Sequence, residues 1–228
     1  MRTKSTGQLI NIRAPFLKRY EKLWESAPEE AEFVRMRGFD FNECICPETL
    51  LFVGINPSCD VNTALPSDID MPNRCAIMKK HPYYKALEEV STNSGFNGIY
   101  SAADVFAIRT PQLDVIKNAI KTIPGFKDFC IEQFKIFKDI VRMTKPRAIV
   151  VCNAYAREWF SNQTINPEAY ELSVFDEKIG TRRIINDIAL NNVPVFFCGM
   201  FSGRHQVDKG SRERLEWQIK RAKKNKLL

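Results

Sequence analysis

Four short apolar runs, separated by long segments, constrain the fold of this chain more than any other feature of the sequence. Each run is four to six residues long and nearly unbroken in apolar character, which is typical of strands buried on both faces, as in a parallel sheet. The segments between the runs have helical spacing, so helical crossovers can join successive parallel strands. The pattern predicts an α/β fold with three layers, α/β/α, around a central four-stranded parallel sheet. The predicted strands lie near residues 50–55, 104–109, 147–152 and 193–198.

The clearest helical segment precedes the third run. Its apolar residues Cys130, Phe134, Phe137 and Val141 repeat at spacings of four, three and four, which marks one face of a helix. Pro146 follows closely and predicts the end of that helix, because the residue before a proline avoids the helical conformation.

The length of 228 residues fits one large domain, and we expect residues 1–228 to form a single α/β unit. Residues 1–48 carry two helical patterns and are predicted to be an N-terminal helical cover. Residues 49–228 are predicted to form the core, which ends in a basic helix. Within the core, residues 59–82 predict a loop over the site, and residues 172–185 predict a hairpin that turns near Gly180.

Two absences bear on where the protein resides. No apolar run approaches the roughly 20 residues that a membrane span needs, and the first residues lead into no apolar segment of a signal peptide. The seven cysteines are an odd number, and Cys130, Cys152 and Cys198 lie in apolar stretches, where a reduced thiol behaves as a small hydrophobe. We therefore expect a cytoplasmic protein, monomeric and without membrane contact.

The net charge of +7 is concentrated near the end of the sequence. Residues 203–228 hold nine lysines and arginines against three acidic residues, a surplus of six. Such a block is typical of a protein that binds a polyanion. It is also typical of a solvated last helix with a frayed end, which charge alone favours, and the sequence leaves both interpretations open.

Polar, small or glycine-rich residues follow every predicted strand. In open parallel sheets, ligands bind beyond the carboxyl ends of the strands, so these residues predict the site. We expect Asn56, Asp104, Arg109 and His205 to face one cleft. The four segments are residues 54–58, 109–111, 153–155 and 199–205.

Several common sites are missing from the sequence. There is no Walker phosphate loop, no Gly-x-Gly-x-x-Gly, no His-Glu-x-x-His and no Gly-x-Ser-x-Gly. Cys44 and Cys46 have no matching cysteine or histidine pair at zinc spacing. We therefore predict no metal and no cofactor.

The first strand and the residues after it resemble a known motif. Residues 52–58 read Phe-Val-Gly-Ile-Asn-Pro-Ser, which is similar to the first motif of the uracil-DNA glycosylase superfamily and closest to the Gly-Ile-Asn-Pro version of its mismatch-specific branch. Residues 95–98 and 104–111 resemble the second-strand region, particularly that of an uncharacterised domain family of the same clan. Residues 145–151 resemble the entry to the third strand. The resemblance covers roughly residues 50–220 and implies a uracil-DNA glycosylase-like fold.

Three positions depart from the family's pattern. The second motif of the superfamily usually reads His-Pro-Ser, whereas Gln206 follows His205 here. The position that often carries a base-reading asparagine is Asp104, which accepts but does not donate when ionised and so suits a base edge that offers a donor. Some branches hold an iron–sulfur cluster. Cys130 resembles one ligand position but Ile108 occupies another, so we predict no cluster.

The resemblance implies cleavage of an N-glycosidic bond by two catalytic side chains. Asn56 would hold a water near the anomeric carbon, because a cation-like sugar reacts with weak nucleophiles. His205 and nearby backbone N–H groups would donate to the oxygen of the departing base. Pro57 would fix the backbone beside Asn56. The loop position of Asn56 predicts that its truncation costs only about 1 kcal/mol of stability.

The remaining candidates would hold the flipped-out base or the DNA backbone. The base must leave the stack and would gain from an aromatic platform, for which Phe106, Tyr83 and Tyr84 are candidates. The residues predicted to bind substrate are Gly54, Ile55, Pro57, Ser58, Asp104, Phe106, Arg109, Asn153 and Ser202. Those predicted to bind DNA phosphates are Arg204, Lys209, Arg212 and Arg214.

Each of these residues also has an ordinary structural interpretation. An Asn-Pro pair after a strand is often only a turn, Phe106 lies inside an apolar run typical of a core, and Arg109 would pair with an acid as readily as with a phosphate. The leading hypothesis is a DNA glycosylase-like N-glycosidic hydrolase. The alternatives are a non-catalytic module of the same fold that binds DNA or another nucleic acid, and a hydrolase of free nucleosides or nucleotides, which would not need the basic helix.

Overall fold

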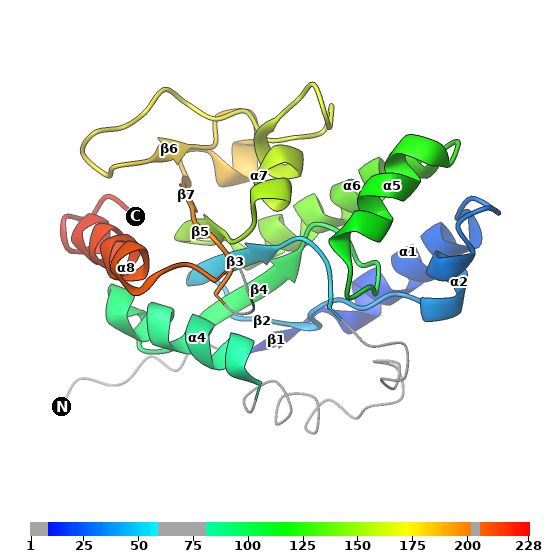
Figure 1. Cartoon of the computed structure of the whole chain (residues 1–228). Helices are drawn as coiled ribbons and strands as arrows, with labels where there is room; N and C mark the ends of the chain where they lie inside the picture. The colour runs from blue at the N-terminus through cyan, green and yellow to red at the C-terminus, as the bar shows by residue number, and fades with distance from the viewer. Residues whose placement is uncertain (1–8, 59–80, 202–205) are drawn as a thin grey trace.

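A five-stranded sheet forms the centre of the protein, in a computed structural model that describes residues 9–58, 81–201 and 206–228 (Figure 1). The strand order is β4-β3-β5-β7-β6. The first four of these strands run parallel, and β6 pairs antiparallel with β7 at the edge. The predicted sheet of four parallel strands is therefore confirmed, with one short strand added to it. The bounds are β3 (Leu50–Gly54), β4 (Tyr100–Asp104), β5 (Ala148–Val151), β6 (Arg182–Arg183) and β7 (Pro194–Phe197).

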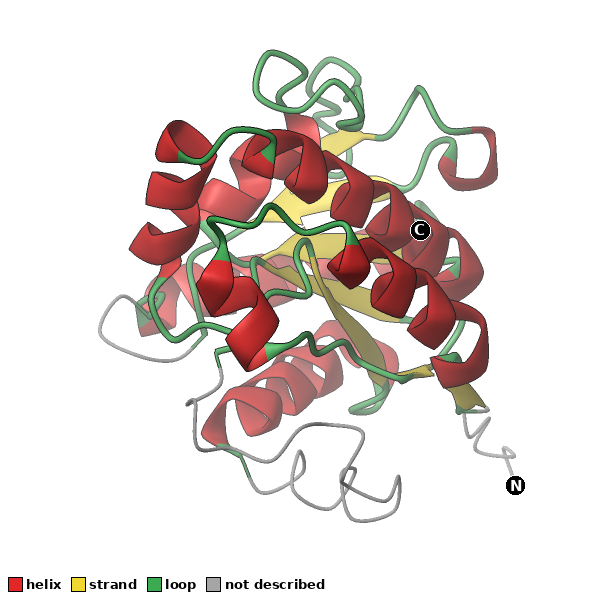
Figure 2. Ribbon diagram, turned by 90° about the vertical axis from the view of Figure 1, so that its right-hand side faces the viewer, coloured by secondary structure: helices red, strands yellow, loops and turns green. Residues whose placement is uncertain are grey.

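Helices cover both faces of this sheet, as Figure 2 shows from the side. The strand residues alternate between the faces, as the strand period requires. Leu51 and Val53 join a cluster with residues of α1, α5, α6 and α7, whereas Leu50 and Phe52 join a cluster with residues of α4 and α8. The three layers predicted from the sequence are thus present. The helices are α1 (Arg13–Glu25), α2 (Glu32–Arg37), α4 (Pro82–Ser91), α5 (Leu113–Thr122), α6 (Phe126–Thr144), α7 (Ala154–Ser161) and α8 (Lys209–Lys224).

The predicted position of the second strand, residues 104–109, is wrong. The strand is β4, which ends at Asp104, and residues 105–108 continue beyond it as a buried loop. The backbone N–H of Ala107 donates to Gln133 Oε1 of α6 at 3.0 Å, in the interior of the protein. The apolar run therefore reflects burial against α6 and not membership of the sheet.

Residues 9–48, in the region predicted to be an N-terminal helical cover, hold the helices α1 and α2 and a small sheet. In that sheet β1 (Ile10–Asn11) pairs antiparallel with β2 (Cys44–Ile45). Between α2 and β2 the chain runs beside the loop that follows β4: Phe39 forms a bridge with Ile108, and the N–H of Asp40 donates to Ala107 O at 2.9 Å. The cover thereby brings Asp40 to the carboxyl end of the sheet.

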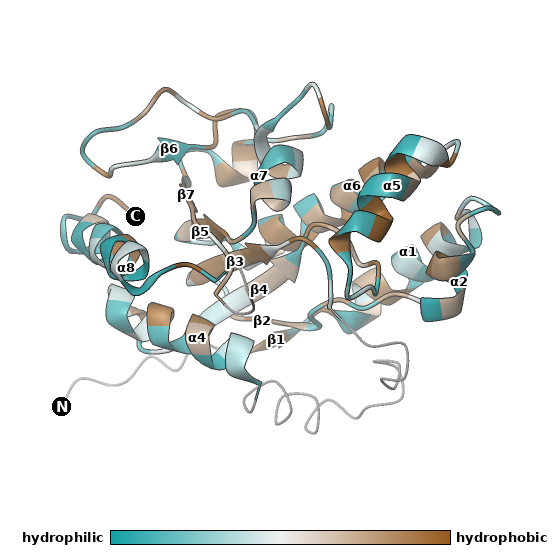
Figure 3. Ribbon diagram, in the orientation of Figure 1, coloured by the Kyte–Doolittle hydropathy of each residue, from teal (hydrophilic) through white to brown (hydrophobic). Residues whose placement is uncertain are grey.

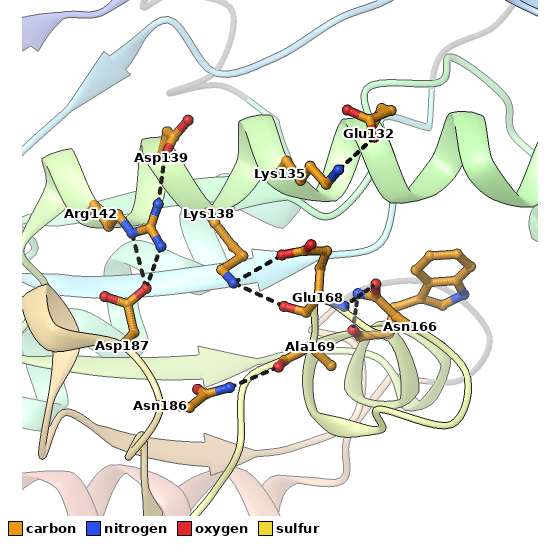
Figure 4. Close-up of polar contacts among 11 residues, drawn as sticks. Glu132, Lys135, Lys138, Asp139, Arg142, Asn166, Glu168, Ala169, Asn186 and Asp187 are labelled. Carbon is orange, nitrogen blue, oxygen red and sulfur yellow. Dashed lines mark hydrogen bonds and ion pairs between the residues drawn. The ribbon is translucent and has the colours of Figure 1, made fainter.

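Polar contacts hold the chain between α7 and β7 against α6 (Figure 4). Arg142 Nη2 lies 2.9 Å from Oδ2 of the buried Asp187. Lys138 Nζ donates to Glu168 O at 3.1 Å. The hairpin predicted over residues 172–185 lies in this region and is confirmed by two antiparallel bridges, with Gly180 at a positive φ of 75° in its turn.

Two further findings on the described part of the chain concern the state of its cysteines and the length of its apolar helices. The five cysteines found there, Cys44, Cys46, Cys130, Cys152 and Cys198, are all free thiols. None of the helices described is long and apolar enough to cross a membrane.

Candidate functional site

The carboxyl ends of β3 and β4 meet at one edge of the sheet (Figure 1). In the register of the two strands, Gly54 lies opposite Asp104. The pairing of the next strands continues one residue past their ends, since the N–H of Cys152 donates to Val53 O at 2.9 Å and the N–H of Cys198 donates to Val151 O at 3.0 Å. These strand ends therefore bring a carboxyl and two thiols to the same edge.

The side chain of Asp104 lies over the α-carbon of Gly54. A β-carbon built on Gly54 would stand 2.1 Å from Asp104 Oδ1 and 3.8 Å from the phenol oxygen of Tyr83. The first distance is far below van der Waals contact, so the carboxyl occupies the space that any larger residue would fill. Glycine at position 54 is thus required by the close approach of Asp104 and not by its own backbone angles.

Asp104 is a carboxyl group with an unusual affinity for its proton. Burial raises the pKa of Asp104 to about 7, and the charge of Asp40 adds to the effect. Near neutral pH the group is therefore present in both forms. The protonated form donates a hydrogen bond, which extends the acceptor role that the sequence suggests for this residue. A pKa near the working pH is also the condition for general acid–base catalysis.

Two protonated groups, Tyr83 and Cys152, lie near this carboxyl. Burial raises the pKa of Tyr83 well above its ordinary value, and the charges of Cys152 and Asp104 raise it further. Burial also raises the pKa of the Cys152 thiol, together with a hydrogen bond between the two thiols of Cys152 and Cys198. Among the described residues, Tyr83 and Cys152 are therefore neutral groups near the Asp104 carboxyl and give it no counter-charge.

The side chain of Asn56 is fixed by its amide nitrogen. Nδ2 donates to the carbonyls of Thr110 at 2.8 Å, Pro57 at 3.1 Å and Ile108 at 3.2 Å. These bonds tie the end of β3 to the loop after β4. Within the described residues Oδ1 accepts no hydrogen bond, so the oxygen is the end of the amide that is available to an incoming donor such as water.

Two predicted site residues lie in the interior. Phe106 is completely buried and packs edge to face against Trp159, with ring centroids 4.8 Å apart. Arg109 is also buried, and its Nη1 donates to Arg37 O at the end of α2 at 3.0 Å. Neither residue therefore lies on an open surface. Phe106 is part of the core, as the apolar run around it allows. Arg109 connects the loop after β4 to α2.

The other candidates from the strand ends have mixed positions. Asn153 caps α7, since its Oδ1 accepts from the N–H of Tyr155 at 2.8 Å and of Ala156 at 3.3 Å. Ile55 is buried, Pro57 is partly exposed and Ser58 is exposed. The candidates Ser202, Arg204 and His205 lie outside the described residues.

The predicted phosphate-binding residues of α8 separate into two groups. Arg212 is partly buried and pairs with Glu89 of α4 at 2.8 Å and with Glu216 at 2.9 Å. Its position shows a structural contact between two helices. Lys209 and Arg214 are exposed, and Lys209 is 3.8 Å from Glu213.

Sequence reasoning missed Asp40, the thiol pair and the role of Tyr83 beside Asp104. A signal for the thiols exists, because Cys152 and Cys198 each directly follow a predicted buried strand. The approach of Asp40 has no signal in the sequence, since it depends on a bridge between residues 39 and 108.

In residues 9–58, 81–201 and 206–228, no three metal-ligating side chains gather closely enough to hold an ion. No protein-family model matches the chain, and no curated protein matches it.

Proposed function

We propose that the chain is a DNA glycosylase-like N-glycosidic hydrolase with a uracil-DNA glycosylase-like fold, which acts on a base flipped out of DNA. The observation that carries the proposal is the position of Asn56 just after β3 and of Asp104 at the end of β4, at the carboxyl ends of two neighbouring parallel strands. One side chain is an amide fixed by its nitrogen, and the other is a carboxyl whose pKa is raised to about 7. The three-layer architecture and the motif at residues 52–58 support the same proposal.

The proposed reaction divides the chemistry between these two residues. Asn56 Oδ1 accepts a hydrogen bond from the attacking water, whose oxygen forms the new bond to the anomeric carbon. The bond between that carbon and the base nitrogen breaks, and its electron pair leaves with the base. The neutral carboxyl of Asp104 donates a hydrogen bond to the departing base and stabilises its developing negative charge. The proton that the water loses passes to the solvent, and the departed base takes up one proton from the solvent. His205 remains a predicted second donor.

The direction of the pH dependence follows from the protonated form of Asp104. Because the neutral carboxyl is the donor, base release falls as the pH rises through about 7. Asp104→Asn keeps a donor at this position but cannot titrate. The rate of base release by this variant should therefore be nearly independent of pH between 6 and 8. At pH 6, where the wild type carries mostly the neutral carboxyl, the variant should release the base more slowly than the wild type.

The test is a release screen over oligonucleotides, single-stranded and duplex, that contain uracil, hypoxanthine, xanthine or mismatched thymine. We expect release from at least one of them, and a loss of about a hundredfold or more in Asn56→Ala. Asp114→Asn is the matched control, because its side chain is 84% exposed and lies on α5. Wild-type rates in both Asn56→Ala and Asp104→Asn would contradict the proposed roles.

The hydrogen bonds from Asn56 to three carbonyl groups are also compatible with a second function, the binding of nucleic acid without catalysis. In that case Asn56 only holds the loop in place. That function predicts salt-dependent binding of DNA with no release of any base in the screen. Release from free nucleosides, with no binding of DNA, would instead indicate a nucleoside hydrolase.

A further inference from the structure

An exposed tryptophan on α8 is surrounded by positive charge. Trp217 is 57% exposed, and the guanidinium carbon of Arg221 lies 5.3 Å from the centre of its ring. Residues three, four and seven positions apart share one side of a helix, which places Arg214, Lys220, Arg221 and Lys224 beside the indole. We call Trp217 and these four cations the Trp217 face; the same spacing places one acid, Glu213, on this side, where its carboxylate lies 3.8 Å from Lys209 Nζ.

The packing of α8 does not use this face. Leu215, Ile219 and Ala222 are buried on the opposite side of the helix. The helix is also fastened by polar bonds, since Arg212 pairs with Glu89 and Asn93 Nδ2 donates to Glu216 Oε2 at 2.9 Å. Figure 3 shows largely hydrophilic colour along the outer side of α8. A large indole in this position therefore adds nothing to the core.

The charge on the Trp217 face is not neutralised by the protein. The ion pairs of α8 within the described residues involve Lys209 and Arg212. The four cations of the face form no ion pair with a carboxylate of the described residues, and all four are exposed. The face therefore presents four positive charges around one aromatic ring.

We propose that the Trp217 face binds single-stranded nucleic acid, with an unpaired base stacked on the indole and phosphates on the surrounding cations. A base stacked on an aromatic ring contributes about 1–3 kcal/mol, and a guanidinium beside that ring adds a cation–π contribution. In a duplex the faces of the bases are covered by their neighbours, so the indole selects for single strands. The distance along α8 from Arg214 to Lys224, about 15 Å, accommodates a few nucleotides.

The composition of the face favours nucleic acid over an anionic membrane. A helix that lies in a membrane interface buries an apolar face, whereas Trp217 is the one apolar side chain among these five residues. The inference stands apart from the proposed hydrolase, because binding to this face requires neither Asn56 nor Asp104.

The test is a fluorescence titration of the full chain with a single-stranded oligothymidylate and with a duplex of matched length. We expect the single strand to quench tryptophan emission and to bind more tightly than the duplex. Trp159 is completely buried and Trp24 is partly buried, so the quenching reports mainly on Trp217. Trp217→Leu should weaken binding about tenfold or more and remove most of the quenching, and Trp217→Phe should restore part of the affinity.

The contribution of the cations is tested separately. Lys220→Gln with Lys224→Gln should lower the salt slope of single-strand binding by about 1.4. The control is Lys18→Gln with Lys22→Gln on α1, which changes the net charge equally in the opposite layer of the fold.

Three outcomes would overturn the inference. They are unchanged affinity in folded Trp217→Leu, an equal loss of slope in the α1 control, and binding to phosphatidylserine vesicles without binding to the oligonucleotide. Folding of each variant is checked by thermal melting. Because the readout is binding, a failure of base release leaves this result intact, and a failure here leaves the release screen intact.

Discussion

The carboxyl oxygen Oδ1 of Asp104 occupies the space where a side chain at Gly54 would begin, 2.1 Å from the position of its β-carbon. The two residues end neighbouring parallel strands and lie opposite each other in register. The Asp104 carboxyl can therefore take this position only because Gly54 on the adjacent strand has no side chain. This relationship makes the geometry of the proposed acid testable through the residue beside it.

Gly54→Ala should destabilise the protein by about 1–3 kcal/mol, because the new methyl group must displace the Asp104 carboxyl. In an Asp104→Ala background most of this cost should disappear, which a double-mutant cycle in urea would measure as a coupling energy. Gly199→Ala is the control, since a β-carbon there would make only ordinary contacts, the nearest at 3.5 Å from Val207. Equal costs of Gly54→Ala in both backgrounds would contradict the close approach.

The stability of the protein should fall as the pH rises between about 4 and 7, because the pKa of Asp104 is raised to about 7 in the folded state. In that window the folded protein keeps a proton that the unfolded chain releases, so increasing pH favours unfolding. The loss from Asp104 between pH 5 and pH 8 is at most about 3 kcal/mol.

Urea unfolding of Asp104→Asn at both pH values isolates this contribution, since the variant cannot titrate at position 104. Relative to the wild type, the variant should gain stability as the pH rises. Asp114→Asn is the control, because the Asp114 side chain is 84% exposed. A constant difference between Asp104→Asn and the wild type from pH 5 to pH 8 would show that the folded pKa is not raised.

Asn56→Asp should destabilise the protein more than Asn56→Ala, because it replaces a donor by an acceptor facing three carbonyls. We expect about 1–3 kcal/mol for Asn56→Ala and a larger cost for Asn56→Asp at pH 8. The sequence alone suggests only about 1 kcal/mol for the truncation of a loop residue. Thermal melts of both variants check the order. If Asn56→Asp proved as stable as the wild type, the amide would not be bound through its nitrogen.

Arg212 and Arg214 should have separate effects, although the sequence places both in one basic block. Arg212→Gln removes the pairs with Glu89 and Glu216 and should cost about 1–3 kcal/mol of stability. Arg214→Gln should leave the melting temperature unchanged and lower the salt slope of nucleic-acid binding by about 0.7 to 0.9. Melting curves and salt titrations of the two variants would show this separation. Identical behaviour in both assays would contradict it.

The sheet could be predicted because strands buried on both faces carry no polar residues to interrupt their pattern, as at residues 50–54 and 148–151. The strand β4 was misplaced for a physical reason: it lies at the edge of the sheet and includes Ser101 and two alanines, whereas the loop after it is apolar and fully covered. A buried loop and a buried strand both produce an apolar run in the sequence, and only the pairing with the neighbouring strand distinguishes the two.

The candidate site was predictable in its location but not in its chemistry. Asn56 follows a strand and Asp104 ends one, so their positions follow from the rule that ligands bind at the carboxyl ends of parallel strands. The raised pKa of Asp104 depends on its burial and on Asp40, which arrives through a contact between distant segments. Likewise, the helix N-cap formed by Asn153 and the core position of Phe106 depend on neighbours that a pattern of residue types does not specify.

The covering of Leu50, Phe52 and Phe196 by α8 has a consequence for how the chain is made. Each of these residues precedes α8 in the sequence, so during synthesis the sheet emerges from the ribosome before the helix that closes this side of it. Until Leu215 and Ile219 have left the exit tunnel, a nascent chain exposes an apolar surface on one side only. Chaperones that bind nascent chains should therefore associate most strongly with stalled chains whose emerged part ends just before Lys209, and should be released once α8 has emerged.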